Sequence, residues 1–218
     1  MPNIRLLLKE FVTHDVKRFI FTRPQGMQAQ AGQAFLLAQP DNPDDQHPFS
    51  PVSSRDDEVL EFLIKCYPEH KGMTLWLHQL PIGTEVLAAA VMGEIHYRDK
   101  GVFVAGGTGI TPFLAVMREL VVTGQVEGHS LLFSNRTRAD VILQSELEAY
   151  FGPRAIFTLT RDQCVGYESR HIDADFLKKA VSDFAQNFYV CGPRKFVQDI
   201  NDALVSLGAS TPNLIFER

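Results

Sequence analysis

The segment "VFVAGGTGITPFLAVMREL" (Val102–Leu120) changes its periodicity across a cluster of three glycines. Before the glycines, a short β-branched and aromatic run predicts a buried strand. After them, apolar residues recur at i, i+3, i+4 and i+7 and predict one face of a helix: Phe113, Val116, Met117 and Leu120. The segment therefore predicts a strand, a glycine turn and a helix, in that order.

The glycine turn has the properties of a phosphate-binding site. Glycines between a strand and a helix leave backbone N–H groups free at the positive end of the helix dipole, which favours phosphate. Thr111 is a suitable N-cap, and Pro112 suits the first helical position, where no N–H is required. However, Pro112 replaces the third glycine of the common dinucleotide fingerprint, and the next strand ends in "FSNRTR" without the usual acid. A nucleotide-phosphate turn of another kind is favoured over a plain strand-to-helix turn.

The two halves of the chain have different patterns. From Asp99 onward, strand-like runs such as "HSLLFSN" alternate with helical runs such as "LQSELEAYFG", which predicts an α/β domain with a parallel sheet. Upstream, short Val-, Phe- and Ile-rich runs with turn signals about every ten residues predict a small antiparallel barrel or sandwich. Within that half, "PDNPDDQHP" (Pro40–Pro48) is interpreted as a loop. The predicted domains are residues 1–98 and 99–218.

The composition restricts the possible functions. The 218 residues are 45% hydrophobic and 22% charged, which is ordinary for a globular protein, and the net charge of −5 argues against a nucleic-acid partner. The three cysteines form no C-x-x-C pair, so neither a zinc site nor a cysteine-held iron–sulfur cluster is expected. No signal peptide and no apolar run of membrane-spanning length is visible. We therefore expect a cytoplasmic protein without a membrane span or a metal site.

Four short motifs, taken in order, resemble those of the ferredoxin–NADP reductase superfamily of flavoprotein reductases. "HPFSPVSS" (His47–Ser54) resembles the flavin motif R-x-[YF]-S-x-x-S, and "AGGTGITP" (Ala105–Pro112) resembles the nicotinamide-nucleotide turn. "VCGP" (Val190–Pro193) resembles the C-G-P motif, and "IFER" (Ile215–Arg218) the terminal acidic segment. The resemblance covers nearly the whole chain. It implies an N-terminal antiparallel β-barrel that binds flavin and a C-terminal α/β parallel-sheet domain that binds NAD(P)H.

The resemblance also implies flavin-binding residues. Ser50 matches a serine that hydrogen-bonds near the reactive nitrogen of the flavin, and Phe49 matches an aromatic residue that packs on the ring. Thr74 matches a hydroxyl at a helix start that binds the flavin phosphate, although a purely structural cap is an equal alternative. The implied flavin set is His47, Pro48, Phe49, Ser50, Ser53, Gly72, Met73 and Thr74.

A second implied set concerns NAD(P)H and catalysis. Cys191 matches the cysteine beside the reactive nicotinamide carbon, and Glu217 matches the C-terminal acid near the flavin, so that the implied catalytic residues are Ser50, Cys191 and Glu217. Arg136 and Arg138 match the region near the adenosine ribose, where they either hold a 2′-phosphate or are solvated loop charges. The implied NAD(P)H set is Gly106, Gly107, Thr108, Gly109, Thr111, Pro112, Asn135, Arg136, Arg138, Cys191, Gly192 and Pro193.

Three positions depart from the family pattern. His47 stands where the family has an arginine, and because histidine is only partly charged near neutral pH, weaker or pH-dependent flavin binding is expected. Lys71 stands where a glycine is usual. The chain ends at Arg218 without the aromatic residue that covers the second flavin face in many relatives, which implies a more open nicotinamide face.

The resemblance implies an enzyme that transfers hydride from NADH or NADPH to bound FAD, with FMN less expected, and then passes electrons to an acceptor. Ferredoxin, flavodoxin, a cytochrome or a small molecule are all possible acceptors. Two alternatives remain open: a reductase subunit of a larger electron-transfer complex, and a nucleotide-binding regulatory module that has lost the flavin. Neither the choice between NADH and NADPH nor the oligomeric state follows from the residues.

Overall fold

The computed structural model describes residues 1–27, 30–91 and 95–216. The chain divides into two units. The first unit comprises Met1–Gly93 and Thr111–Arg118, and the second comprises Glu94–Ile110 and Glu119–Arg218. Each unit has its own sheet and its own hydrophobic core.

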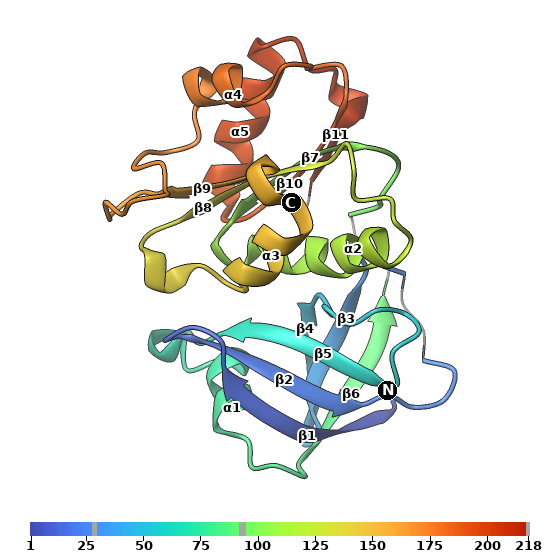
Figure 1. Ribbon diagram of the computed structural model, residues 1–218. Helices are drawn as coiled ribbons and strands as arrows, with labels where there is room; N and C mark the ends of the chain where they lie inside the picture. The colour runs from blue at the N-terminus through green and yellow to red at the C-terminus, as the bar shows by residue number, and fades with distance from the viewer. Residues whose placement is uncertain (28–29, 92–94, 217–218) are drawn as a thin grey trace. The chain divides into compact units, whose positions relative to one another are not determined.

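Within the described residues, the first unit contains a six-stranded antiparallel sheet with the order β4-β3-β6-β1-β2-β5 (Figure 1). The antiparallel architecture predicted from the sequence is therefore confirmed. Among the described residues before Val91, one short α-helix, α1, and a 3₁₀ turn at Pro68–His70 accompany the sheet, and the unit also includes the part of α2 (Thr111–Val122) up to Arg118. The bounds are β1 (Asn3–Phe11), β2 (Val16–Thr22), β3 (Ala34–Gln39), β4 (Asn42–Phe49), β5 (Val59–Lys65), α1 (Met73–Gln79) and β6 (Glu85–Val91).

Phenylalanine side chains fill the core of the first unit. Phe62 on β5 contacts Phe21 and Phe35 edge-on, with ring centroids 6.0 and 6.2 Å away, and all three rings are fully buried. Edge-to-face contacts of this kind are favourable beyond the area they bury. β5 lies at one edge of the sheet next to β2, whereas β3 lies next to the opposite edge strand. Contact between Phe62 on β5 and Phe35 on β3 therefore requires the sheet to curve around one shared core.

One prediction for this unit is wrong. The segment Pro40–Pro48, interpreted as a loop, contributes most of strand β4, which pairs with β3. β4 lies at the edge of the sheet, and an edge strand tolerates prolines and exposed charges because one side of its backbone has no ladder to complete. The polar composition therefore marked an edge position rather than the absence of a strand.

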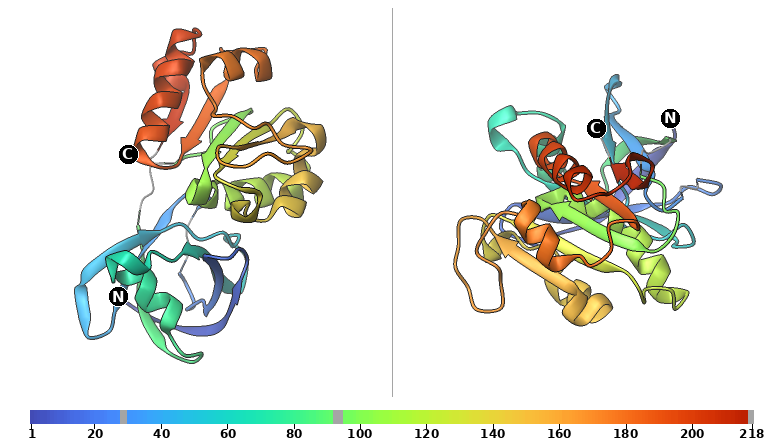
Figure 2. Two further views of the ribbon diagram at one scale, coloured as in Figure 1. Left: turned by 90° about the vertical axis from the view of Figure 1, so that its left-hand side faces the viewer. Right: turned by 90° about the horizontal axis from the view of Figure 1, so that it is seen from above.

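The second unit contains, among the described residues, a five-stranded parallel sheet with the order β11-β10-β7-β8-β9. Figure 2 shows this sheet with helices on both of its faces. The predicted α/β domain is confirmed. The bounds are β7 (Gly101–Gly106), α2 (Thr111–Val122, divided between the units), β8 (Ser130–Asn135), α3 (Gln144–Phe151), β9 (Ala155–Leu159), α4 (Ala174–Ala180), β10 (Asn187–Cys191), α5 (Arg194–Ser206) and β11 (Leu214–Phe216).

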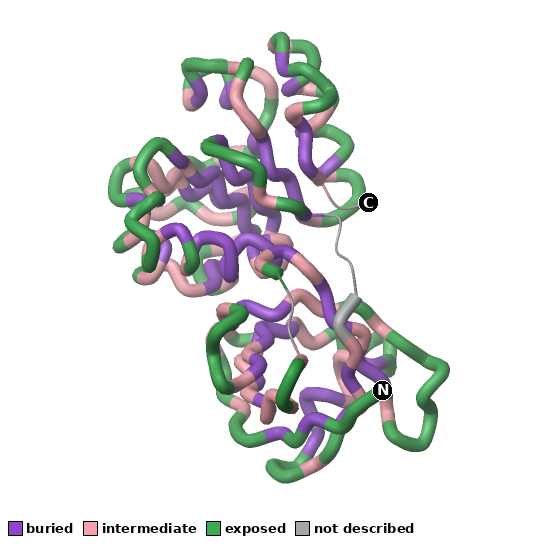
Figure 3. The backbone as a smooth tube through the Cα atoms, turned by 90° about the vertical axis from the view of Figure 1, so that its right-hand side faces the viewer, coloured by how far each residue is buried: buried purple, intermediate pink, exposed green. Residues whose placement is uncertain are grey.

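Strand β7 is buried along its whole length, as expected for a central parallel strand, and Figure 3 shows the same for much of this sheet. Successive side chains of a strand point to opposite faces. Val102 and Val104 pack in the cluster that contains α4 and α5, whereas Phe103 contacts Phe151 of α3. The glycine turn that leaves β7 is thus supported by apolar packing on both sides of the sheet.

The start of α2 differs from the sequence prediction by one residue. Gly107–Ile110 forms a 3₁₀ turn, so that Ile110 is the N-cap, Thr111 is the first helical residue and Pro112 is the second. The 3₁₀ turn already brings the backbone of Ile110 into a helical conformation, which moves the cap one residue upstream. Pro112 remains compatible with the helix because the first four N–H groups have no partner within it.

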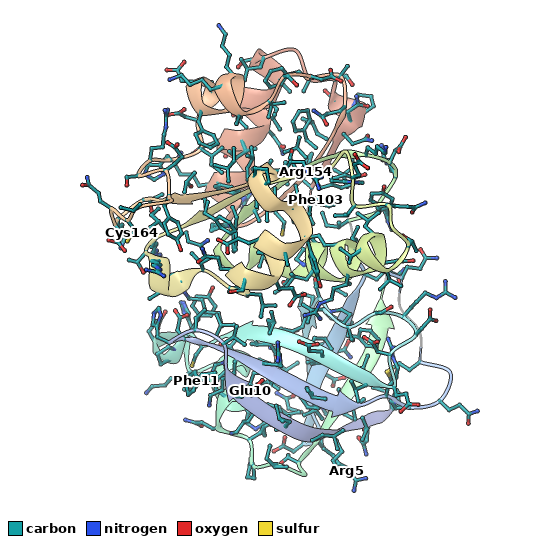
Figure 4. The ribbon with its side chains drawn as sticks, in the orientation of Figure 1. Arg5, Glu10, Phe11, Phe103, Arg154 and Cys164 are labelled. Atoms are coloured by element: carbon teal, nitrogen blue, oxygen red, sulfur yellow. The ribbon has the colours of Figure 1, made fainter. Side chains whose placement is uncertain are left out.

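A neutral histidine is buried in each unit. His129 is 1% exposed, stacks on Phe103, and lies 3.2 Å from the Tyr97 hydroxyl, while Arg154 hydrogen-bonds the His129 carbonyl (Figure 4). His78 is 7% exposed and its Nε2 donates to the Ile64 carbonyl at 2.7 Å. Burial lowers the pKa of both rings, and nearby lysine and arginine side chains lower it further. Both histidines are therefore held uncharged by the fold.

We predict that the protein loses stability as the pH falls below about 6.5, the ordinary pKa of histidine. Between the lowered folded pKa and this value, the unfolded chain binds more protons than the native one, so the free energy of unfolding decreases with decreasing pH. Denaturant unfolding across this pH range measures the slope. The variants His129→Gln and His78→Gln should each flatten it. If both variants retain the slope of the unmodified protein, these histidines are not its cause.

Candidate functional site

The glycine turn after β7 lies directly against the end of β10. A Cβ atom on Gly109 would lie 2.4 Å from the Cys191 carbonyl oxygen, so that only glycine fits without a backbone shift. Gly107 has a φ of +54°, which favours glycine, and a Cβ there would meet open space. Since Ala105 and Cys191 are register partners on adjacent parallel strands, the structure brings the predicted turn and the predicted cysteine together.

The first turn of α2 is suited to an anionic ligand. Its N-cap, Ile110, has no side chain that could accept a hydrogen bond from the first backbone N–H groups. These N–H groups and the helix dipole favour a phosphate at this position. Thr108 and Thr111 are half-buried beside the turn, where their hydroxyls could contribute. The backbone thus fits the diphosphate of a dinucleotide.

A groove of about 950 Å³ adjoins the end of β10 in the second unit. Cys191 is 7% exposed, and Gly192 follows it at the groove wall, while Pro193 is exposed at the start of α5. The groove combines apolar walls with amide and charged side chains, as ligand sites commonly do. Its lining is Cys191, Gly192, Arg194, Val197, Gln198, Asn201, Asp202 and Phe216.

The ends of β8 and β9 form a polar region that includes the predicted adenosine-binding residues. Asn135 is 5% exposed, and neither of its side-chain amide atoms has a hydrogen-bond partner within the described part of the chain. Its carbonyl accepts a hydrogen bond from the Thr160 N–H at 2.9 Å. Arg136 and Arg138 are exposed. The predicted residues of this region therefore lie together at the carboxyl edge of the sheet.

Sequence reasoning missed an acidic residue in this region. Asp162 lines a small cavity of about 310 Å³ together with Thr160 and Arg161. The Arg138 N–H donates to the Asp162 carboxylate at 3.4 Å, and this hydrogen bond is the largest cause that lowers its pKa. Cys164, in the exposed loop after β9 (Figure 4), also lies 3.4 Å from this carboxylate. The position of Asp162 after the next parallel strand was the available signal, because ligands bind where parallel strands end.

The flavin motif begins on the edge strand β4. His47 is half-buried, and its Nε2 lies 3.0 Å from the Asp45 carboxylate, while Pro48 is exposed. Phe49 packs partly against the core of the first unit and Ser50 is half-buried directly after the strand. Both side chains are thus held at the surface of the unit with some area left open. A flat aromatic ring can stack on such a partly covered phenylalanine.

Ser53 has a structural role in the same motif. Its side chain is buried, and its hydroxyl oxygen accepts a hydrogen bond from the Glu61 N–H at 3.1 Å. The bond connects the motif to β5. Any contact of Ser53 with a flavin is an addition to this role.

The segment before α1 fits the second part of the predicted flavin site. Gly72 is the N-cap of α1 and has no side chain to accept from the first-turn N–H groups, so these can meet an oxygen-rich ligand. Thr74 is half-buried beside them, whereas the Met73 side chain is buried in the core and only its backbone can contribute. Lys71 has a φ of +47°, a left-handed conformation that favours glycine. This explains why a glycine is the easier residue there.

The predicted catalytic residues are placed as follows. Ser50 belongs to the first unit and Cys191 to the second, and Glu217 lies outside the described residues.

Among the helices that the structure describes, none has the length and apolar character required to cross a membrane.

Comparison with protein families assigns both halves of the chain. Residues 3–97 match the family model of the oxidoreductase FAD-binding domain, and residues 103–202 match that of the oxidoreductase NAD-binding domain. The donor groups described above fit both ligands. When bound, FAD accepts hydride from a nicotinamide and releases electrons to an acceptor.

Similar proteins agree with this assignment. NADH-cytochrome b5 reductase 2 of Rattus norvegicus is 30% identical over 97% of this chain and 92% of that protein, and the Mus musculus protein of the same name is 28% identical with the same coverage. A cytochrome P450 reductase from Amycolatopsis has a TM-score of 0.88 at 19% identity, covering 100% of this chain and 69% of that chain.

A ferredoxin NADP+ reductase from Neisseria gonorrhoeae with bound FAD and NADP has a TM-score of 0.84 at 19% identity, covering 99% of this chain and 97% of that chain. The predicted family, fold class, enzyme class and cofactors are confirmed. The chain belongs to the ferredoxin–NADP reductase and cytochrome b5 reductase family, whose members use FAD and NAD(P)H to transfer electrons to acceptors.

Proposed function

We propose that this protein is a cytoplasmic NADH-dependent reductase that delivers electrons to a haem protein of the cytochrome b5 kind. Residues 1–98 bind FAD and residues 99–218 bind NADH. The close approach of Gly109 to the Cys191 carbonyl carries the proposal, because it brings a phosphate-binding turn beside the cysteine expected at the nicotinamide. A nicotinamide and its own diphosphate are separated by one ribose, so a single nucleotide can reach both.

Each proposed residue has one task. The N–H groups at the start of α2 hold the diphosphate, with Thr108 beside them. Cys191 orients the nicotinamide, and Phe49 supports the flavin ring while the Ser50 hydroxyl hydrogen-bonds it. Holding the nicotinamide and the flavin in a fixed orientation lowers the entropic part of the barrier to hydride transfer. The redox chemistry itself is supplied by the two cofactors. No side chain has to form a covalent bond.

The acid at the end of β9 supports NADH over NADPH. The Asp162 carboxylate is ionised and lies by the Arg138 backbone, where it can accept hydrogen bonds from ribose hydroxyls and would repel a 2′-phosphate. Arg136 and Arg138 are exposed and remain available as weaker attractants. The curated relatives are named for NADH and for cytochrome b5, which supports the same donor and the same class of acceptor.

The direct test is anaerobic reduction of the purified protein. We expect a yellow protein that binds FAD more tightly than FMN, bleaches faster with NADH than with NADPH, and then reduces cytochrome b5 faster than ferredoxin. Absorbance spectroscopy measures the colour and the binding of each flavin, and stopped-flow absorbance measures the rates of bleaching and of acceptor reduction. A colourless protein that takes up no flavin would favour the regulatory-module alternative and contradict this proposal.

Replacing Gly109 with alanine tests the nucleotide site. The added Cβ would clash with the Cys191 carbonyl, so the turn must move, and we expect the KM for NADH to rise by roughly tenfold or more. Steady-state kinetics with a dye acceptor measure this. Gly124→Ala is the control, since a Cβ there meets no atom within 4 Å and only the φ of +68° is strained. Equal KM values for the two variants would contradict the proposed site.

His47 should make flavin binding depend on pH. The resemblance places His47 near the cofactor phosphate, and an imidazole side chain favours a phosphate more when it is charged, so we expect the FAD dissociation constant to be larger at about pH 8.5 than at about pH 6. Fluorescence titration measures the constant. His47→Arg should remove the pH dependence and bind FAD more tightly at the higher pH. The same dependence in His47→Ala would exclude His47 as its cause.

A further inference from the structure

A carboxylate on β5 lies between two arginines of the first unit. The Glu61 Oε1 atom is 3.0 Å from Nε of Arg18 on β2, and its Oε2 atom is 3.1 Å from Nη1 of Arg118 on α2. The Glu61 and Arg118 side chains are only 16% and 19% exposed. Arg118 lies in the segment Thr111–Arg118, which groups with the first unit.

Arg118 also contacts the flavin motif itself. The same Nη1 atom that meets Glu61 donates a hydrogen bond to the Val52 carbonyl at 2.8 Å. Val52 is buried within "HPFSPVSS", two residues after Ser50. One guanidinium nitrogen therefore joins the motif to the Glu61 carboxylate.

The backbone of β5 holds the same residues from the other side. The Val52 N–H donates to the Glu61 carbonyl at 2.8 Å, and the Glu61 N–H donates to the Ser53 hydroxyl at 3.1 Å. Pro51 forms a bridge with Phe62. The second half of the motif is thus fixed by the backbone of Glu61 on one side and by Arg118 on the other.

Burial makes this arrangement sensitive to its cation. A carboxylate removed from water requires a charged or hydrogen-bonded partner, and loss of one partner leaves the other group poorly solvated. Arg18 is the more exposed of the two arginines at 29%, and it pairs with Glu10 as well as Glu61. Loss of Arg118 would remove a cationic partner of the Glu61 carboxylate and also the donor to the Val52 carbonyl. Loss of Arg18 would leave the hydrogen bond to Val52 intact.

We propose that Arg118 is a positioning residue for the flavin. It fixes the Val52 carbonyl against Glu61 and thereby holds Phe49 and Ser50 in the geometry that binds the flavin ring. The inference rests on the proposed function, in which "HPFSPVSS" forms the flavin site. It adds a residue from the helix that follows the glycine turn, more than sixty positions further along the chain.

The test compares four variants of the full-length protein. Arg118→Met should weaken FAD binding by roughly tenfold or more, as expected for loss of a hydrogen bond from a charged donor. The control Arg18→Met removes the other cation of Glu61 and should weaken it less than about threefold. Arg118→Lys should restore part of the affinity because it keeps a charged donor, and Glu61→Gln should give an intermediate value because the Val52 bond survives.

A second readout separates positioning from loss of stability. At saturating FAD, Arg118→Met should shift the visible flavin spectrum and the midpoint potential, and Arg18→Met should leave both unchanged. Equal effects of Arg118→Met and Arg18→Met on affinity and spectrum would overturn the inference. Failure of the unmodified protein to bind flavin would instead contradict the proposed function. If Arg118→Met does not fold, the visible spectrum and midpoint potential of Arg118→Lys decide: a shift in Arg118→Lys and none in Arg18→Met supports the inference, and no shift in Arg118→Lys overturns it.

Discussion

The organisation of the second unit depends on the close approach between Gly109 and the Cys191 carbonyl. It requires a residue without a Cβ, and it keeps the turn after β7 in contact with the end of the neighbouring parallel strand β10. The helix that follows then presents its first N–H groups at the same edge of the sheet. A steric constraint on one atom thereby places the glycine turn and the start of α2 beside the buried Cys191 thiol, which is the arrangement that the proposed nicotinamide-nucleotide site uses.

Charged and polar side chains are stabilised differently in the two units. In the first, the Glu61 carboxylate is paired with Arg18 and Arg118, and Arg118 also holds the Val52 carbonyl of the flavin motif. In the second, burial keeps His129 neutral, and Asp162 is kept ionised by backbone N–H groups. Each charge near a proposed ligand site is therefore either paired or solvated. At the starts of α1 and α2, no side chain of the N-cap residue competes with a phosphate for the first backbone N–H groups.

The sequence was sufficient for the architecture because periodicity and motif order depend on local residues. The strands and helices after Asp99 and the antiparallel first half follow from such patterns, and the glycine turn was located from spacing alone. Strand β4 was missed because its polar side chains reflect an edge position, which depends on the sheet order. The Glu61–Arg118 pair was also missed, because its residues are far apart along the chain and meet only in the folded protein. The contact of Asp162 with the Arg138 backbone was missed for the same reason. Glu217 stays a prediction.

The central claim is that hydride passes directly from a nicotinamide held at Cys191 to bound FAD. Single-turnover reduction with NADH that carries deuterium at the transferred position of C4 tests it most directly. At saturating nucleotide, the account predicts slower loss of flavin absorbance with the deuterated substrate, because the C4 bond to the label breaks in the step that reduces the flavin. Flavin reduction at the same rate with both substrates, or no flavin reduction at all, would contradict it.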